Sequence, residues 1–248
     1  MRALCWNGVN DLRVKSVADP EILNPRDVIL KVGLSTTCGS DLHLIDGLIP
    51  TMREGDILGH EFMGEVVEVG SEVTKVKRGD RVVVPPFVSC GECFHCEQEQ
   101  YSLCDTSHPK PELAEPILGY PTAGIYVYSH AFGGYSGAHA EYVRVPFADY
   151  VRVPFADVDC FIVPEDVSDE KALFISDAAP TGYMGADFCN IQKGDVIAVW
   201  GCGCVGLMAQ QSAKIMGAEF VIAIDRYPER LAIAEGLARL RSTIPRSM

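Results

Sequence analysis

Four cysteines follow one another at short intervals near the middle of the chain: Cys90, Cys93, Cys96 and Cys104. Thiolate sulfurs at this spacing can close a tetrahedral shell around one Zn²⁺ and leave no position open for water or substrate. Four unrelated buried cysteines are the alternative, but such cysteines rarely show this spacing. The pattern predicts a structural zinc site. We expect His95, within the run, to be a solvated loop residue, because four sulfurs already complete the shell.

A second set of metal-binding residue types is split along the chain. Cys38 lies in TTCGSDLH, and His60 is followed by Glu61 in GHEFMGEVVEVG. A cysteine and a histidine can share a catalytic zinc when a third ligand leaves the fourth position to water or substrate. Taken alone, this is weak evidence, because a single cysteine or histidine is usually a packing residue.

A glycine-rich turn follows the strand-like run VIAVW and precedes a helical pattern. Gly201, Gly203 and Gly206 form GxGxxG, and Asp225 ends the next strand-like run, FVIAID. Such glycines permit a tight turn and close approach of a pyrophosphate, while the helix N-terminus faces the phosphates and the carboxylate binds the ribose 2′-OH. The carboxylate favours NAD over NADP. Arg226, which follows Asp225, is the residue that would instead favour NADP.

The same turn carries two further thiols, Cys202 and Cys204. We expect both to be packing residues and not metal ligands.

Two kinds of local pattern must position these residues. Up to about residue 165, short β-like runs at 27–32, 64–69 and 81–84 are broken by glycine and proline, which is typical of a barrel or of twisted sheets. Residues 89–137 are rich in cysteine, glycine and proline and predict a separate lobe. Strand and helix alternate after residue 165, which predicts a parallel sheet. The expected domains are residues 1–165 and 166–248.

The expected elements of the second domain can be given by residue number. Helices are expected at 165–173, 180–188, 206–217 and 230–238, and strands at 195–200 and 220–225.

Two irregularities interrupt these patterns. Residues 142–149 and 150–157 are the same sequence, YVRVPFAD, in direct tandem. The even repeat length preserves the alternation of side chains, so one copy can replace the other in a sheet while the surplus copy loops out. After Glu235 the sequence GLARLRSTIPRSM shows no third strand. A dinucleotide domain needs two halves, so we expect a truncated chain. A natural short variant is the alternative.

Composition narrows the class of protein. Of the 248 residues, 48% are hydrophobic and 22% charged, as in an ordinary globular protein, and the formal net charge is −13. Such an acidic chain disfavours nucleic-acid binding. The N-terminus lacks a secretory signal pattern, and no apolar run is long enough to cross a bilayer. We expect a cytoplasmic protein without membrane partners, whose clustered thiols bind metal.

The combined motifs resemble the zinc-containing medium-chain dehydrogenase/reductase family over about residues 1–236. GHEFMGEVVEVGSEV matches the pattern GHE-x2-G-x5-G-x2-V, and the four-cysteine run and GxGxxG follow in the family's order. The resemblance implies the fold class α/β plus β: a GroES-like β-barrel domain followed by a Rossmann domain, here incomplete. FISDAAPTGYMGA and the segment LGYPTAGIYVYSHAFGGYSGAHAEYV are similar to the glutathione-independent formaldehyde dehydrogenase subgroup.

The resemblance assigns roles around a catalytic zinc. Cys38 and His60 match two of its ligands, and Asp177 stands where many members have a cysteine as third ligand. A carboxylate oxygen is an accepted zinc ligand, although a helix-capping or surface aspartate is the alternative. Glu61 matches a carboxylate near the zinc. Asp41 matches the partner that fixes the tautomer of the zinc histidine.

The resemblance also implies the reaction and the cofactor contacts. Ser40 and His43 resemble a relay that carries the alcohol proton to solvent, and a structural role for His43 is the alternative. Thr181 is expected to contact the nicotinamide, and Val205 lies in the cofactor turn. The implied activity is zinc-dependent hydride transfer between a primary alcohol or aldehyde and NAD, in a homo-oligomer when the chain has full length.

Two other functions stay open. A zinc-stabilised fragment without turnover follows if missing strands leave the nucleotide pockets half-built. A purely structural zinc module would explain the four cysteines but neither GHE nor GxGxxG. For the chain as it stands, we expect bound zinc, weak or no NAD binding, and self-association through residues 190–248.

Overall fold

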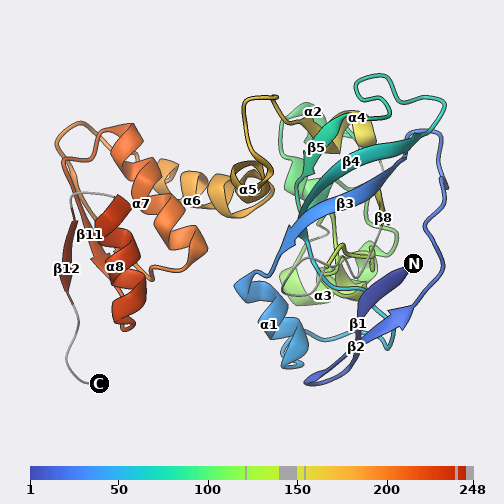
Figure 1. The fold of residues 1–248 in the computed structure, drawn as a ribbon, viewed down its shortest axis with the longest axis horizontal. Coiled ribbons are helices and arrows are strands. Elements are labelled where there is room, and N and C mark those ends of the chain that lie inside the picture. The colour runs from blue at the N-terminus through green and yellow to red at the C-terminus, as the bar shows by residue number, and fades with distance from the viewer. Residues whose placement is uncertain (121, 140–149, 154, 238–239, 244–248) are drawn as a thin grey trace. The chain divides into compact units, whose positions relative to one another are not determined.

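The computed structural model describes residues 1–120, 122–139, 150–153, 155–237 and 240–243. The chain forms two compact units, Met1–Ser176 and Asp177–Met248 (Figure 1). The first unit is built mainly of antiparallel strands, and the second alternates strands with helices.

The central sheet of the first unit has five antiparallel strands in the order β8-β3-β4-β5-β9. Their bounds are β3 Val28–Thr36, β4 Glu61–Val69, β5 Arg81–Val84, β8 Tyr150–Val153 and β9 Phe161–Ile162. Two smaller sheets pair β1 (Arg2–Gly8) with β2 (Asp11–Ser16), and β6 (Phe87–Val88) with β7 (Gly124–Ile125). The three strands predicted in this part of the sequence are confirmed.

Period-two alternation explains the burial in this sheet. Val28, Leu30 and Val32 of β3 all point into the core, as expected when every second residue of a strand faces one side. Phe62 of β4 lies in the same core and meets Tyr126 edge-on at a ring-centroid distance of 5.2 Å. This packing fixes β4, which begins one residue after His60.

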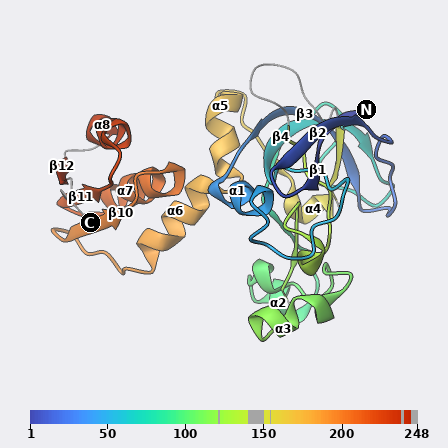
Figure 2. The same ribbon diagram turned by 90° about the horizontal axis from the view of Figure 1, so that it is seen from below.

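Short helices join the strands of the first unit. They are α1 Gly39–Ile45, α2 Phe94–Glu97, α3 Glu115–Leu118, α4 Ala156–Asp159 and α5 Asp169–Ala172, with 3-10 turns η1 Tyr101–Leu103, η2 Pro111–Leu113, η3 His130–Phe132 and η4 Leu173–Ile175. Figure 2 shows α2 at the lower edge of this unit in that view. The segment around α2 contains the four-cysteine run and is called the lobe below.

Only the second copy of the repeated octapeptide lies mostly within the described residues. Its first residues form β8, which pairs with β3 in the register Val28↔Val153 and Leu30↔Val151. The first copy, residues 142–149, lies outside the described residues. Among the described residues, the second copy thus forms the strand that pairs with β3 at this edge of the sheet.

The second unit is a parallel sheet with helices between its strands. Its elements are α6 Ala178–Asp187, β10 Val196–Trp200, α7 Cys204–Met216, β11 Phe220–Ile224, α8 Pro228–Leu237 and β12 Leu240–Thr243. The strand order is β10-β11-β12, with parallel pairing throughout. The predicted strands at 195–200 and 220–225 and the helices at 180–188, 206–217 and 230–238 are confirmed to within a few residues.

Two expectations for secondary structure were wrong. The sequence indicated no third strand after Glu235, but β12 pairs with β11 through Leu240–Thr243. Parallel pairing uses backbone groups, so the polar run RST can join a sheet without the apolar pattern by which strands are recognised. The helix expected at 165–173 begins only at Asp169, and a 3-10 turn replaces its last residues.

Helices cover one face of the second unit's sheet and leave side chains exposed on the other. Ile197, Val199 and Val221 pack with α6 and α7, whereas Val196 and Trp200 of the same β10 strand are exposed. No helix in the described part of the chain is both long and apolar enough to cross a membrane.

Candidate metal and dinucleotide sites

The four cysteine sulfurs of the lobe converge. All four ligand atoms lie within 4.8 Å of one another. The Cys90 and Cys96 sulfurs are 4.0 Å apart, and those of Cys93 and Cys104 are 3.9 Å apart. Zinc–sulfur bonds of about 2.3 Å in a tetrahedron place sulfurs about 3.8 Å apart. The donor chemistry and the spacing both fit a closed zinc–thiolate site.

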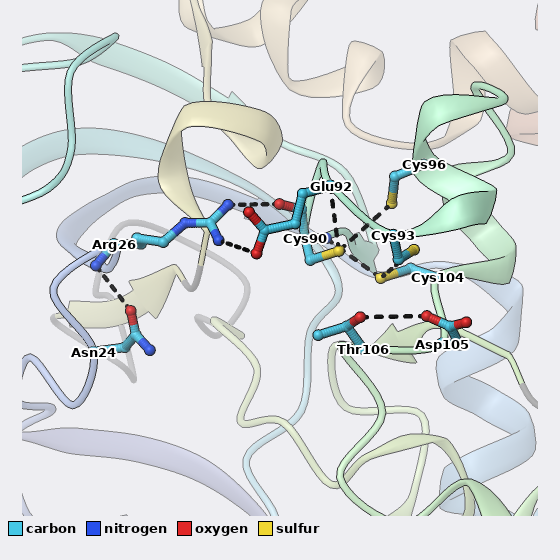
Figure 3. A network of polar contacts seen from close by, with 9 residues as sticks. All are labelled: Asn24, Arg26, Cys90, Glu92, Cys93, Cys96, Cys104, Asp105 and Thr106. Atoms are coloured by element: carbon cyan, nitrogen blue, oxygen red, sulfur yellow. Dashed lines mark hydrogen bonds and ion pairs between the residues drawn. The ribbon is translucent and has the colours of Figure 1, made fainter.

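Polar groups from the lobe and from Arg26 surround these sulfurs (Figure 3). The backbone N–H of Glu92 donates to Cys90 Sγ at 3.5 Å, and that of Cys90 donates to Cys104 Sγ at 3.3 Å. Arg26 donates to the Cys90 carbonyl at 2.6 Å and pairs with Glu92 at 2.8 Å. Burial raises the pKa of the Cys96 thiol. Since zinc binds the thiolate, metal binding at this site would release the thiol protons.

His95 does not join this group. Its ring lies against Gln100, with Nδ1 at 3.3 Å from the side-chain oxygen, and the group of ligand atoms consists of the four sulfurs.

A second convergence lies where β3 and β4 meet in the first unit. The sulfur of Cys38, a ring nitrogen of His60 and a carboxylate oxygen of Glu61 lie within 4.8 Å of one another. Cys38 immediately precedes α1, and Glu61 begins β4. His60 and Glu61 are almost fully buried. A thiol, an imidazole and a carboxylate that converge in this way form a donor set that suits zinc. Burying such polar groups is costly unless they are paired or bind a metal.

Asp41 organises both sides of this second group. Its carboxylate is fully buried. One oxygen accepts the backbone N–H of Cys38 at 2.8 Å, and the other lies 3.3 Å from Nδ1 of His60. A carboxylate beside Nδ1 leaves Nε2 of the imidazole to face a metal.

His139 is a member of this region that sequence patterns did not indicate. Its buried ring contacts Thr37 and Ser35, and its Nε2 lies 3.8 Å from the Asp41 carboxylate. Burial lowers the pKa of His139, so the ring is neutral near pH 7. The sequence GAHAEYV carries no metal-ligand spacing, so only the fold brings this histidine to the site.

The two residues of the expected proton relay lie on α1. Ser40 Oγ is 3.6 Å from Cys38 Sγ, which places the hydroxyl beside the donor group. His43 follows three residues later and its side chain is exposed to solvent. The pair thus leads from the buried group to the surface along one helix.

Asp177 is the first residue of the second unit and the N-cap of α6. Its carboxylate accepts a hydrogen bond from the Thr181 hydroxyl at 2.6 Å. One peptide bond separates it from Ser176, which ends the first unit.

The glycine-rich turn lies between β10 and α7. Gly201 has φ +93°, a left-handed conformation that glycine adopts without strain, and Gly203 is the N-cap of α7. A Cβ on Gly206 would lie 1.9 Å from the Gly201 carbonyl oxygen, so only glycine fits. The expected strand–turn–helix geometry is present, with the helix N-terminus at the turn.

Asp225 follows β11 directly and is hydrogen-bonded to the turn. It accepts the backbone N–H of Cys202 at 2.7 Å and that of Tyr227 at 2.9 Å. The Cys202 N–H, followed by the Tyr227 N–H, lowers the pKa of this carboxyl below its usual value. Arg226 and Arg230 both stack on Tyr227, each 4.7 Å from the ring centroid.

The two thiols of the turn differ in burial. Cys202 is buried and accepts a hydrogen bond from Gln210 at 3.4 Å, which confirms a packing role. Cys204 is exposed, so the expectation that it packs was wrong. Cys204 is the first residue of α7, directly after the turn.

Known proteins are similar to this chain in both sequence and fold. Residues 24–155 match the alcohol dehydrogenase GroES-like domain. A zinc-type alcohol dehydrogenase-like protein of Bacillus subtilis is 44% identical over 95% of this chain and 58% of its own length. A glutathione-independent formaldehyde dehydrogenase of Pseudomonas aeruginosa is 36% identical over 94% of this chain and 56% of its own length. The structure of an alcohol dehydrogenase from Thermus sp. ATN1 superposes with a TM-score of 0.84 at 37% identity, covering 98% of this chain and 63% of that one.

The chain therefore belongs to the zinc-containing medium-chain alcohol dehydrogenase family, and its fold is a GroES-like domain followed by part of a Rossmann domain. It spans somewhat more than half the length of the curated relatives given above.

Proposed function

We propose that this chain carries the metal and cofactor machinery of a zinc-dependent oxidoreductase, which transfers a hydride between a primary alcohol or aldehyde and NAD. The observation that carries the proposal is the convergence of Cys38, His60 and Glu61 in a chain of this family. A relative named formaldehyde dehydrogenase suggests small substrates.

Two zinc ions per chain are proposed. The four lobe cysteines would hold a structural ion, as their spacing of about 4 Å supports. Cys38, His60 and Asp177 would hold the catalytic ion. Asp177 directly follows Ser176 in the chain, and its carboxylate is oriented by Thr181. Bound at the second site, zinc would supply Lewis-acid polarisation of the substrate oxygen.

The chain's own residues would handle the proton and hold the metal ligands. Ser40 would take the alcohol proton and His43, exposed on the same helix, would pass it to solvent. Asp41 would hold His60 in the tautomer that presents Nε2. The buried carboxylate of Glu61 would lie beside the metal and assist ligand exchange.

The turn of the second unit would bind NAD. Gly201, Gly203, Val205 and Gly206 would admit the pyrophosphate at the N-terminus of α7. Asp225 would accept hydrogen bonds from the ribose hydroxyls and disfavour a 2′-phosphate.

The remaining cofactor contacts follow from the residues next to this carboxylate and from α6. Arg226 stacks on Tyr227 and would flank the adenosine. Thr181 would contact the nicotinamide, as the family resemblance implies.

The alternative is a zinc-binding fragment without turnover. The exposed apolar side chains of the second unit's sheet favour it, because a complete dinucleotide domain buries both faces of its sheet. Homo-oligomer formation is proposed for the full-length form. A cytoplasmic location is proposed because the clustered cysteines are arranged for metal binding, which suits a reducing compartment.

Metal content tests the proposal. Purified protein should contain two zinc ions by elemental analysis. Cys38→Ser should lose one ion and keep its fold, while Cys93→Ser should lose the other and unfold more readily, because a closed zinc site contributes directly to folding. NADH formation from alcohols by the same samples separates the enzyme from the inactive fragment. Well under one zinc in the unmodified protein would refute both assignments.

A further inference from the structure

His139 touches the chain segments on both sides of the proposed catalytic metal site, although it lies far from them in sequence. The backbone N–H of His139 donates to the carbonyl of Leu58 at 2.7 Å, and that of Ala138 donates to Gly59 at 2.9 Å. Gly59 has φ +96°, and a Cβ there would lie 2.6 Å from the backbone nitrogen of His139. His139 is thus packed directly against the residue that precedes His60.

The ring of His139 reaches the other ligand segment as well. Its Nε2 lies 3.1 Å from the hydroxyl of Thr37, the residue before Cys38. Its Nδ1 lies 3.3 Å from the hydroxyl of Ser35, which itself donates to the carbonyl of Glu61 at 3.1 Å. His139 therefore links the two segments: its ring contacts the hydroxyls of Ser35 and Thr37 beside Cys38 and packs against Gly59, and its backbone N–H bonds Leu58 on the His60 side.

The hydrogen-bond inventory fixes the tautomer. Ser35 has one hydroxyl hydrogen and gives it to the Glu61 carbonyl, so Nδ1 of His139 must donate to Ser35. In a neutral ring Nε2 then accepts from Thr37. Both ring nitrogens therefore have hydroxyl partners.

We propose that His139 is a positioning residue, which sets the separation of Cys38 and His60 through Thr37, Ser35 and Gly59. The inference rests on the proposed function, since it assumes that these two residues hold a metal ion. Removing a direct hydrogen-bond partner of a metal ligand typically lowers metal affinity 10–100-fold. His139 acts through the neighbours of the ligands, so the lower end of this range, about tenfold, is expected.

Cobalt titration of the metal-free full chain tests this role, because Co²⁺ reports ligand geometry through its visible absorption. Wild-type protein should take up two Co²⁺ ions, and Cys38→Ser identifies which absorption belongs to the second site. His139→Leu should weaken Co²⁺ binding at that site about tenfold and shift its absorption, while the four-cysteine site keeps its affinity. His139→Gln, which can still donate to Ser35 and accept from Thr37, should stay within roughly threefold of wild type.

The matched control is His108→Leu. His108 is equally buried, but its ring bonds Ala131 and the backbone of Lys110. This variant should bind both Co²⁺ ions normally. If His139→Leu fails to fold, Thr37→Val removes one ring contact and should still weaken the second site.

The outcomes separate the two proposals. Wild-type protein that takes up only one Co²⁺ would overturn the catalytic metal site and with it the positioning role. Two ions in wild type, with unchanged affinity and absorption in His139→Leu or in folded Thr37→Val, would overturn the role of His139 alone.

Discussion

Asp159 illustrates how a buried carboxylate can support one site while lowering the stability of the fold. It lies almost fully inside the first unit and accepts the backbone N–H of Ser89 at 2.9 Å, next to the first lobe cysteine. Burial raises its pKa well above the usual range. The folded state therefore binds this proton more tightly than the unfolded state does.

Replacing Asp159 by asparagine should stabilise the protein at neutral pH. The raised pKa means that wild type loses free energy of unfolding as pH rises above the unfolded value near 4, whereas an amide cannot ionise. The gain in Asp159→Asn should therefore grow as pH rises from about 4 toward neutrality in urea titrations. A gain that shrinks with rising pH would contradict the expected sign.

Asp157, two residues away, provides the opposite control. Burial raises its pKa, but hydrogen bonds from Lys75 and Thr74 outweigh this and leave the pKa lowered. Its stabilisation is present at neutral pH and is lost as pH falls. Asp157→Asn should therefore destabilise the chain at pH 7, with a smaller effect in acid.

Asp225 should decide which nicotinamide cofactor binds. In a chain restored to full length, Asp225→Ser removes the carboxylate that is bonded to the glycine turn and proposed to bind the ribose, so NAD affinity should fall about tenfold or more. The preference for NAD over NADP should fall with it, because the repulsion of a 2′-phosphate is gone. Isothermal titration with both nucleotides measures this, and equal affinities in wild type would refute the ribose argument.

At the scale of elements, β8 and the residues after it show what one copy of the repeat does. Phe155 packs under Arg26, with the guanidinium 4.9 Å from the ring centroid, and the Ala156 N–H donates to the Arg26 carbonyl at 2.9 Å. The second copy thus makes both the edge pairing and the contacts that follow it.

Deleting one copy of YVRVPFAD should leave the fold intact. Removal of 142–149 or of 150–157 gives the same polypeptide, in which one copy remains before Val158. The deletion shortens the chain segment before Val158 by eight residues, which changes the free energy of closing that loop by only about 1 kcal/mol or less. Zinc content and the urea midpoint should match wild type. Loss of zinc or folding would mean that both copies are required.

At the scale of the whole molecule, the second unit's sheet presents an unusual surface. Val196, Trp200 and Phe220 are 59%, 77% and 50% exposed on the face that the described helices leave open. Val196 and Phe220 also line a hollow of about 320 Å³ together with Ile222. Contiguous apolar side chains of this size favour association in water.

The chain should self-associate through this face. Trp200→Lys combined with Phe220→Lys should reduce the scattering mass at micromolar concentration, because each charge opposes burial in a contact. Ile215→Lys, at an 80% exposed position on α7, is the control and should leave association unchanged. A wild-type monomer that binds NAD tightly would show that this face does not drive association.

The sequence by itself determined the features that depend on local spacing. The cysteine run, the GxGxxG turn and three strands of the first sheet were predictable because neighbours in sequence set those patterns. The placing of Cys38 beside His60 was predictable only from family resemblance, since twenty-one residues and a helix separate them.

Only the tertiary structure decided the rest. His139 reaches the metal site because its segment hydrogen-bonds to residues 57–59, and no local pattern encodes a contact about eighty residues away. β12 joins its sheet through backbone groups, which carry no side-chain signal. Cys202 and Cys204 look alike in sequence, but the curvature of the turn buries one and exposes the other. Contacts between distant segments depend on packing in three dimensions, and that is where sequence patterns lose their information.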